Sequence, residues 1–128
     1  MQVMETGDVD QTGESMADQR NSSRQNPLVS IITVVFNGVN NIEATLLSVI
    51  NQSYKNKEYI IVDGGSTDGT VDIIKMYESK ITHWTSEPDG GIYDAMNKGL
   101  EKATGQWINF MNSGDRFASM DEIGRAHV

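Results

Sequence analysis

The chain has 128 residues, the length of one small domain or part of one, and its 38% hydrophobic and 22% charged residues suit a soluble protein with some unstructured chain. Its net charge of −8 argues against nucleic-acid binding, which relies on basic side chains that neutralise phosphates. The absence of cysteine excludes a disulfide scaffold and a zinc–thiolate site, and the sequence shows neither a membrane-spanning apolar run nor a signal-peptide core. We therefore expect a cytoplasmic protein without a transmembrane segment.

The first 26 residues differ in composition from the rest of the chain. They are rich in Gln, Ser, Asn and Gly, contain five acidic residues and have few apolar side chains. Such a segment cannot bury enough apolar surface to offset the entropy lost on ordering. We predict a disordered tail over residues 1–26.

From Pro27 onward, strand patterns alternate with helix patterns. The nearly unbroken β-branched run over 28–36 is typical of a buried parallel strand, and the apolar spacing from Ile42 to Ile50 indicates an amphipathic helix. The remaining predicted elements, in chain order, are a strand at 58–62, a helix through Val71, Ile74 and Tyr77, a strand at 81–85, a helix from Ile92 to Ala103 and a strand at 107–111.

This alternation predicts an α/β fold with a Rossmann-like, doubly wound parallel sheet of four strands, joined by right-handed crossovers. Ligands bind such sheets beyond the carboxyl ends of the strands, where the strand order reverses. The segments that directly follow the predicted strands are therefore the candidate site: Asn37, 63–65, 87–91 and 112–115.

Asp63, Gly64 and Gly65 follow the second predicted strand. An acidic side chain there can accept hydrogen bonds from a base or a ribose, and glycines let the backbone approach a ligand closely. A tight strand-to-helix turn explains the same residues, and the local sequence does not decide between the two. Asp68, further along, is better explained as a helix cap. The segment is neither a P-loop nor a Gly-x-Gly-x-x-Gly turn.

The loop after the last predicted strand contains Asn112, Ser113 and Asp115, whose oxygens suit a hard divalent cation. Taken alone, an Asx turn explains this loop better. An acidic protein that binds an anionic nucleotide nevertheless needs a metal ion or helix N-termini to offset repulsion. In the third segment, Asp89 and Asp94 can be helix-start acids that favour the helix dipole, and the sequence leaves a binding role open.

Four segments in this order resemble family 2 glycosyltransferases of the GT-A fold, especially those of bacterial surface-polysaccharide synthesis. The segments are VSIITVVFN (29–37), IVDGGSTDGT (61–70), SEPDGGIYDAMNKG (86–99) and GQWINFMNSGD (105–115). The resemblance covers about residues 27–117 and implies the donor-binding part of an inverting enzyme. Such an enzyme moves a sugar from a nucleotide diphosphate sugar to a saccharide or lipid-linked acceptor, and can work at the inner face of the membrane.

The resemblance also implies roles for individual residues. Phe36 and Asn37 would lie beside the nucleotide, and Asp63 near its base or ribose. The loop at 112–115 takes the place of the family's Asp-x-Asp motif, so Asp115 and Asn112 would bind Mg²⁺ or Mn²⁺ with the diphosphate. The full set of nucleotide-sugar-binding residues implied is Phe36, Asn37, Asp63, Gly64, Asp94, Asn112 and Ser113.

The sequence also departs from the family pattern. Gly64 replaces a usual second acid, and Asn112 and Gly114 replace acids of the metal loop. The family's general base lies further downstream than Asp121 or Glu122, so we name no catalytic residue and expect this chain alone to be inactive. The alternative function is a non-catalytic nucleotide-binding fragment.

The last six residues, IGRAHV, match one reading frame of a common sequencing adapter. They continue neither the apolar periodicity nor the capping pattern of the preceding chain. We therefore expect a partial GT-A domain over 27–122 and a non-native tail over 123–128.

Overall fold

The computed structural model describes residues 2–5, 26–120 and 122–125. Five strands and four α-helices follow one another along these residues, with a short 3₁₀ turn (Glu78–Lys80) before β4. The elements are β1 (Gln2–Glu5), β2 (Val29–Val35), α2 (Ile42–Ile50), β3 (Lys57–Asp63), α3 (Thr70–Met76), β4 (His83–Ser86), α4 (Ile92–Lys102), β5 (Trp107–Phe110) and α5 (Glu122–Arg125).

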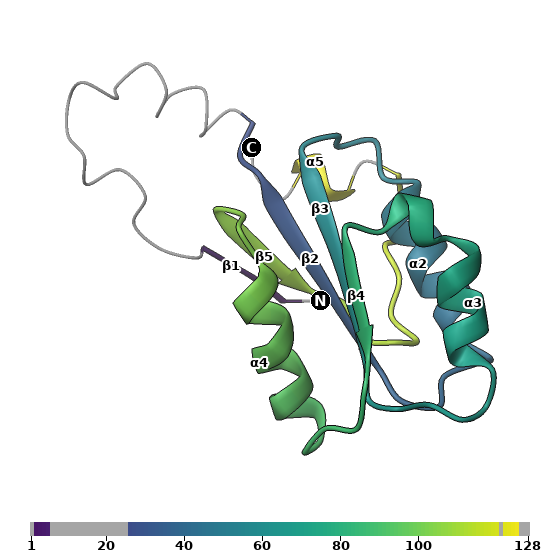
Figure 1. Cartoon of the computed structure of the whole chain (residues 1–128). Coiled ribbons are helices and arrows are strands. Elements are labelled where there is room, and N and C mark those ends of the chain that lie inside the picture. The colour runs from purple at the N-terminus through teal and green to yellow at the C-terminus, as the bar shows by residue number, and fades with distance from the viewer. Residues whose placement is uncertain (1, 6–25, 121, 126–128) are drawn as a thin grey trace.

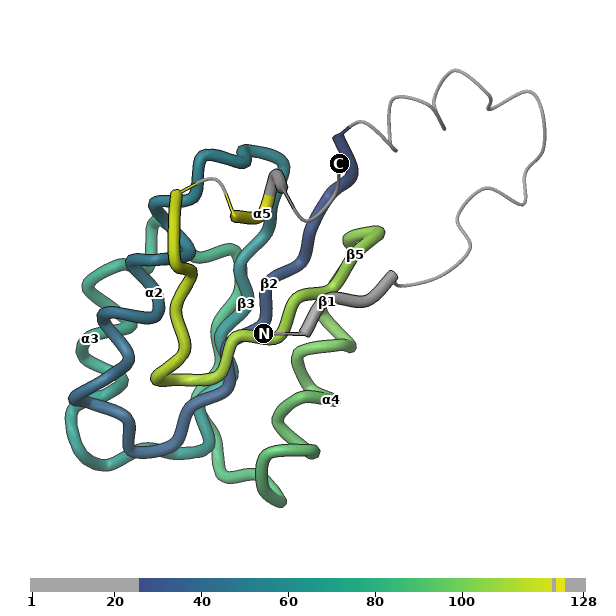
Figure 2. Tube along the Cα trace, turned by 180° about the vertical axis from the view of Figure 1, so that it is seen from behind, coloured from purple at the N-terminus to yellow at the C-terminus, as the bar shows by residue number. Residues whose placement is uncertain are grey.

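The strands form one sheet in the order β1-β5-β2-β3-β4, in which β5, β2, β3 and β4 run parallel. Helices α2 and α3 cover one face of the sheet and α4 covers the other (Figure 1). Seen from behind, the same three layers are visible (Figure 2). The predicted doubly wound α/β fold is confirmed. The strand order reverses at β2, which has β3 on one side and β5 on the other.

Residues 2–5 depart from the predicted disordered tail because they form β1, which pairs antiparallel with β5. Val3, for example, lies opposite Asn109. This pairing satisfies the hydrogen-bonding groups of the backbone at the open edge of β5. It depends on main-chain groups and not on an apolar pattern of side chains, which residues 1–26 lack. The sheet therefore has five strands where four were predicted. Residues 6–25 lie outside the described residues.

The core has two layers because β2 is buried on both faces along its whole length. Ile31 and Val35 belong to the cluster beneath α2 and α3, whereas Ile32 and Val34 belong to the cluster beneath α4. Helix α4 approaches β2 so closely that a Cβ atom on Gly99 would lie 2.5 Å from Cγ2 of Ile32. Glycine at this position therefore allows the helix to pack against the sheet.

The end of the described chain packs against the same domain. Ile123 in α5 is buried, and its backbone N–H donates to Oε1 of Gln52 (3.1 Å). Ile123 is the first residue of the predicted non-native tail, and residues 126–128 of that tail lie outside the described residues. Within the described ranges, no helix is both long and apolar enough to cross a membrane.

Candidate functional site

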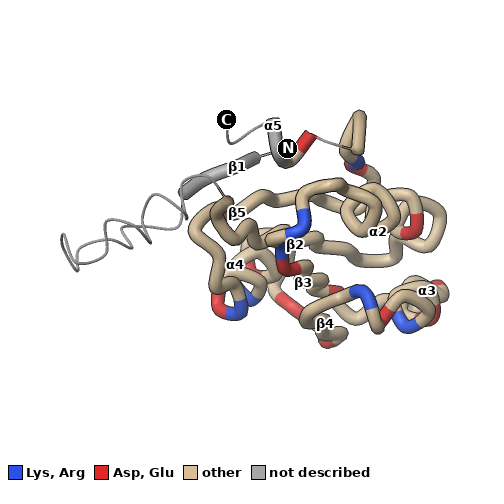
Figure 3. Tube along the Cα trace, turned by 90° about the horizontal axis from the view of Figure 1, so that it is seen from above, with Lys and Arg blue, Asp and Glu red and all other residues tan. Residues whose placement is uncertain are grey.

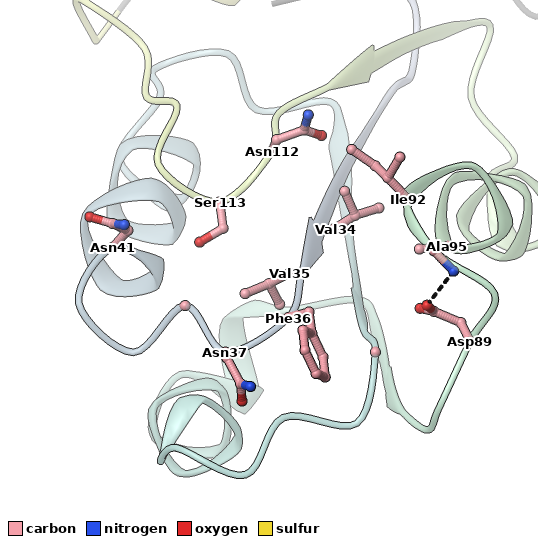
Figure 4. A pocket seen from close by; sticks show the side chains of 13 residues that line it. Val34, Val35, Phe36, Asn37, Asn41, Asp89, Ile92, Ala95, Asn112 and Ser113 are labelled. Atoms are coloured by element: carbon pink, nitrogen blue, oxygen red, sulfur yellow. Dashed lines mark hydrogen bonds between the residues drawn. The ribbon is translucent and has the colours of Figure 1, made fainter.

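A cavity of about 680 Å³ opens at the carboxyl ends of β2, β3 and β5, beside the first turns of α2 and α4. This is the position where the strand order reverses, as expected for a doubly wound sheet. The lining residues are Val34, Val35, Phe36, Asn37, Gly38, Asn41, Gly64, Asp89, Gly91, Ile92, Ala95, Asn112 and Ser113 (Figure 4). Of the residues predicted to bind the nucleotide sugar, the cavity brings together Phe36, Asn37, Gly64, Asn112 and Ser113.

Asn37 joins the loop after β2 to the loop after β3. Its backbone has a φ of 50°, a left-handed conformation that asparagine tolerates better than most residues. Its N–H donates to Oγ of Ser66 (2.7 Å), and its Oδ1 accepts the N–H of Thr67 (2.9 Å). The neighbouring Phe36 side chain is 64% exposed at the edge of the cavity.

Asp68 provides a second link between these loops. One carboxylate oxygen accepts the N–H of Val39 (3.1 Å), and the other accepts the N–H and the hydroxyl of Thr70 (3.1 and 2.5 Å). The hydrogen bond from the Thr70 hydroxyl is the main reason why the pKa of Asp68 is lowered from its usual value. The predicted N-cap position of Asp68 is wrong by one residue, because Gly69 occupies the N-cap of α3 and Asp68 precedes it.

The loop after β5 contributes two unusual oxygen atoms. Oδ1 of Asn112 and Oγ of Ser113 are buried and have no hydrogen-bond partner among the described residues. Both residues line the cavity on the side of the loop after β5 (Figure 4). A Cβ atom on Gly38 would lie 2.7 Å from Oγ of Ser113, so only glycine allows this approach. Because a buried oxygen without a partner is costly, these two atoms are suited to contact a ligand.

Charge is sparse in the cavity wall. Asp89 is the one ionisable side chain among the lining residues, and none of them is Lys or Arg. Over the described part of the chain, basic residues are scattered and form no continuous stretch (Figure 3). The N-terminal end of α4 already holds the carboxylates of Asp89 and Asp94, which accept the N–H groups of Gly91 and Gly90. An anion in this cavity would therefore be stabilised by the N-terminal end of α2 and by a bound cation, because no basic lining side chain is available.

Three of the predicted acidic residues are not among the lining residues. Asp63 is fully buried and accepts hydrogen bonds from the loop beside it. Asp94 accepts the N–H of Gly90 (2.9 Å) and lies 3.7 Å from Nζ of Lys98. Asp115 accepts the N–H of Asn112 (3.2 Å). Their roles as ligand contacts stay predictions.

Lys98 on α4 organises the segment that leads into this helix. Its Nζ lies 3.2 Å from the carboxylate of Glu87 and donates to the carbonyl oxygen of Pro88 (3.4 Å). Partial burial lowers the pKa of Lys98, but the hydrogen bond to Glu87 and the charges of Glu87, Asp94 and Asp89 outweigh this effect and raise it overall. The charged Lys98 side chain therefore holds Glu87 and Pro88, in the segment before α4, against this helix.

Sequence reasoning missed several lining residues. Asn41, Ile92 and Ala95 lie in the first turns of α2 and α4 or just before them. Asp89 was considered as a helix-start acid, with a binding role left open. The signal that could have identified all four is the strand order, because two helices that begin at the switch point both present their first turns to the same cavity.

The family model for glycosyl transferase family 2 matches residues 30–123. An uncharacterised glycosyltransferase of Mycobacterium tuberculosis is 43% identical over 101 residues, which cover 78% of this chain and 38% of that protein. The putative teichuronic acid biosynthesis glycosyltransferase TuaG of Bacillus subtilis is 44% identical over 94 residues, or 71% of this chain and 37% of TuaG. The chain thus spans less than two-fifths of the length of either relative.

A solved structure resembles the fold closely. The mannosyltransferase PcManGT from Pyrobaculum calidifontis, in complex with GDP-Man and Mn²⁺, superposes with a TM-score of 0.74 and 25% identity, over 79% of this chain and 31% of that one. The predicted resemblance is confirmed by the match over most of the chain and by the GT-A architecture of its structural neighbours. This chain belongs to glycosyl transferase family 2.

Proposed function

We propose that the chain is the donor-binding part of an inverting glycosyltransferase that uses a nucleotide diphosphate sugar. The observation that carries the proposal is the cavity at the switch point, with two unpartnered oxygens on one wall and two helix N-termini at its rim. The bound GDP-Man of the mannosyltransferase supports this class of donor. The acceptor we propose is a saccharide or a lipid-linked acceptor, and the teichuronic acid biosynthesis named for the Bacillus relative supports a saccharide.

The oxygens of the 112–115 loop fit a divalent cation such as Mg²⁺ or Mn²⁺. Oδ1 of Asn112 and Oγ of Ser113 have no hydrogen-bond partner within the described residues, and the carboxylate of Asp115 lies in the same short loop. Hard cations prefer such oxygens, and Mg²⁺ commonly binds through one carboxylate together with substrate phosphates. Among the described residues no three His, Cys, Asp or Glu side chains gather into a metal cluster. We propose that these loop oxygens, together with the donor diphosphate, would hold the cation.

These residues would act in transfer by binding and orienting the donor. The first turn of α2 would face the phosphates with its positive dipole end, and Phe36 offers an aromatic surface to the base. When bound, the cation neutralises charge that builds on the leaving diphosphate. The acceptor hydroxyl oxygen bonds to the anomeric carbon while the bond from that carbon to the diphosphate breaks. We assign no residue to the base that takes the hydroxyl proton.

The test is calorimetric titration of the chain with UDP and GDP, with Mn²⁺ or with EDTA. We expect at least about tenfold tighter binding of one or both nucleotides with Mn²⁺, because one strong cation–diphosphate contact is worth about 1.4 kcal/mol or more. Asp115→Ala should remove most of this enhancement. Asp72→Ala, which changes an exposed acid on α3, is the matched control.

The two parts of the proposal fail in different ways. Equal affinity in Mn²⁺ and EDTA would overturn the assignment of the metal loop but leave nucleotide binding intact. An absence of binding for any nucleotide, in a chain that retains its circular dichroism spectrum, would overturn the donor-binding function itself.

A further inference from the structure

We infer that Thr45 on α2 is a positioning residue for the metal loop, the segment 112–115, because its hydroxyl holds the tip of this loop in place. The inference rests on the proposed donor-binding function and adds to it a residue that acts through the loop without contacting the cation. Thr45 is fully buried in the first turn of α2 and is not among the residues that line the cavity. In Figure 4 the loop that carries Ser113 passes beside this helix.

The metal loop finds acceptors for three of its four backbone N–H groups in itself and in the sheet. The N–H of Asn112 donates to Oδ2 of Asp115 (3.2 Å), and the N–H of Asp115 donates to the carbonyl oxygen of Asn112 (2.8 Å). The N–H of Ser113 donates to the carbonyl oxygen of Val34 in β2 (3.1 Å). These bonds close the loop and tie one side of it to the sheet. The fourth N–H, that of Gly114 at the tip, is satisfied by another element.

Thr45 accepts this fourth N–H at its Oγ1 (2.9 Å). The Thr45 hydroxyl donates its own hydrogen to the carbonyl oxygen of Asn41 (3.3 Å), so a lone pair of Oγ1 is directed to the loop. Gly114 has a φ of 103°, and no atom lies within 4 Å of the place that its Cβ atom would occupy. Packing does not hold the tip on that side. Among the described residues, Thr45 is the one side chain outside the loop that accepts a hydrogen bond from the loop backbone.

The position of this tip determines where the proposed metal ligands lie. Gly114 stands between Ser113 and Asp115, and a peptide bond is planar, so an N–H held by Thr45 also fixes the carbonyl group of Ser113. Oγ of Ser113 is buried without a partner among the described residues, and its direction follows from the same backbone. Groups that orient metal ligands typically contribute roughly 10- to 100-fold to metal affinity. Loss of the Thr45 hydroxyl should therefore weaken cation binding while the cavity keeps its shape.

Two other polar side chains follow Thr45 along α2, and they hold the chain after the loop. Oγ of Ser48, one turn further along the helix, accepts the N–H of Phe117 (3.2 Å). Oε1 of Gln52, just after the helix, accepts the N–H of Ile123 (3.1 Å). These contacts anchor the segment that leaves the metal loop, whereas Thr45 contacts the loop itself. The same helix thus offers a residue whose removal should affect anchoring without affecting cation binding.

The test is calorimetric titration of the full chain with UDP and GDP, in Mn²⁺ and in EDTA. The quantity compared is the Mn²⁺ enhancement, which is the dissociation constant in EDTA divided by that in Mn²⁺. Thr45→Val keeps the shape of the side chain but removes the acceptor, so the enhancement should fall at least about fivefold while affinity in EDTA changes less than about twofold. Thr45→Ser keeps the hydroxyl and should keep the enhancement.

Thr33→Val is the matched control, because Thr33 is also fully buried and its hydroxyl bonds to the hydroxyl of Tyr59 (2.7 Å). This variant should keep the Mn²⁺ enhancement even if it is less stable. A second measurement needs neither metal nor nucleotide. In Thr45→Val, hydrogen exchange at the Gly114 amide should be at least about tenfold faster than in the unmodified chain, because this N–H loses its acceptor.

Four results would overturn the inference. An unchanged enhancement in Thr45→Val would do so and leave the proposed function intact, and unchanged exchange at Gly114 would remove the hydrogen bond on which the inference depends. An equal loss of enhancement in Ser48→Ala would assign the effect to general anchoring of the segment. No enhancement in the unmodified chain would overturn the metal part of the proposed function, and this inference with it. If Thr45→Val does not fold, Thr45→Ala removes the same hydroxyl without placing a methyl group against the loop, and the same comparisons apply.

Discussion

Asp63 offers a sharp test of whether a residue binds ligand or holds the site together. Its carboxylate is fully buried at the end of β3. Oδ2 accepts the N–H groups of Gly65 and Ser66 and the hydroxyl of Ser86 (3.0, 2.8 and 2.8 Å), and Oδ1 accepts the hydroxyl of Ser66 (2.5 Å). Both oxygens are thus occupied by the loop that follows β3 and by the last residue of β4. We predict that Asp63 acts through the stability of these loops.

Replacement by alanine should lower the free energy of unfolding by about 4 kcal/mol, because two backbone N–H groups and two hydroxyls lose a charged acceptor. Burying the Asp63 carboxylate costs free energy, and the alanine variant no longer has this cost. The loss of stability is therefore smaller than the sum of four charge-assisted hydrogen bonds. Asp63→Asn should cost only about 1.5 kcal/mol, because the amide oxygen can take the place of Oδ2 and keep three of the four acceptor contacts.

The assay is urea unfolding, followed by the fluorescence of Trp84 and Trp107. The slope of the unfolding free energy against urea concentration must be the same in all variants for their stabilities to be compared. Nucleotide affinity is measured on the same samples. The reasoning would be refuted if Asp63→Asn kept the stability of the unmodified chain and yet lost nucleotide binding. That result would make Asp63 a ligand contact, as the resemblance to the family implies.

Three further changes address packing, pH and the cavity. Gly99→Ala should destabilise the chain by about 1–3 kcal/mol in urea unfolding, because its Cβ atom would overlap Ile32; an unchanged midpoint would contradict the packing of α4. The pKa of Asp68 is lowered from 3.8 on folding, so its stabilising effect is present above about pH 4 and is lost as the pH falls through the folded-state value. The difference in unfolding free energy between Asp68→Asn and the unmodified chain should therefore shrink as the pH is lowered from about 7 to about 3. A difference that stays constant over this range would exclude ionisation of Asp68 as its cause. Gly38→Ala should displace Ser113 and weaken UDP binding in calorimetry at least about tenfold, and unaltered affinity would place the ligand elsewhere.

Much of the fold could be predicted because the buried strands have simple patterns. The unbroken β-branched run of β2 reflects burial on both faces, and the order of strands and helices follows from alternation. The strand predicted at 81–85 is instead His83–Ser86, because a 3₁₀ turn over Glu78–Lys80 precedes it and Ile81 packs in the core. Strand β1 could not be predicted, since its pairing with β5 depends on main-chain groups rather than on side-chain pattern.

The candidate site could be predicted only where it follows strands directly. Asn37, Asn112 and Ser113 were identified because carboxyl strand ends meet at one edge of the sheet. The sequence could not show that the Asp63 carboxylate turns toward its own loop. Nor could it show that Asp89 reaches the cavity, because that depends on the space left by a glycine in a different loop.

The hydrogen bonds that join the cavity loops cross long stretches of sequence. The N–H of Asn37 meets a side chain 29 residues away, and the N–H of Gly114 meets the hydroxyl of Thr45 across 69 residues. The cavity wall therefore cannot open without breaking contacts between segments that are distant in the sequence. A ligand that binds only the folded chain links its binding to global unfolding. A ligand present at 100 times its dissociation constant would stabilise the whole chain by about 2.7 kcal/mol. Melting temperature would then rise with nucleotide concentration, and exchange would slow for those amides of the central strands that exchange only through global unfolding.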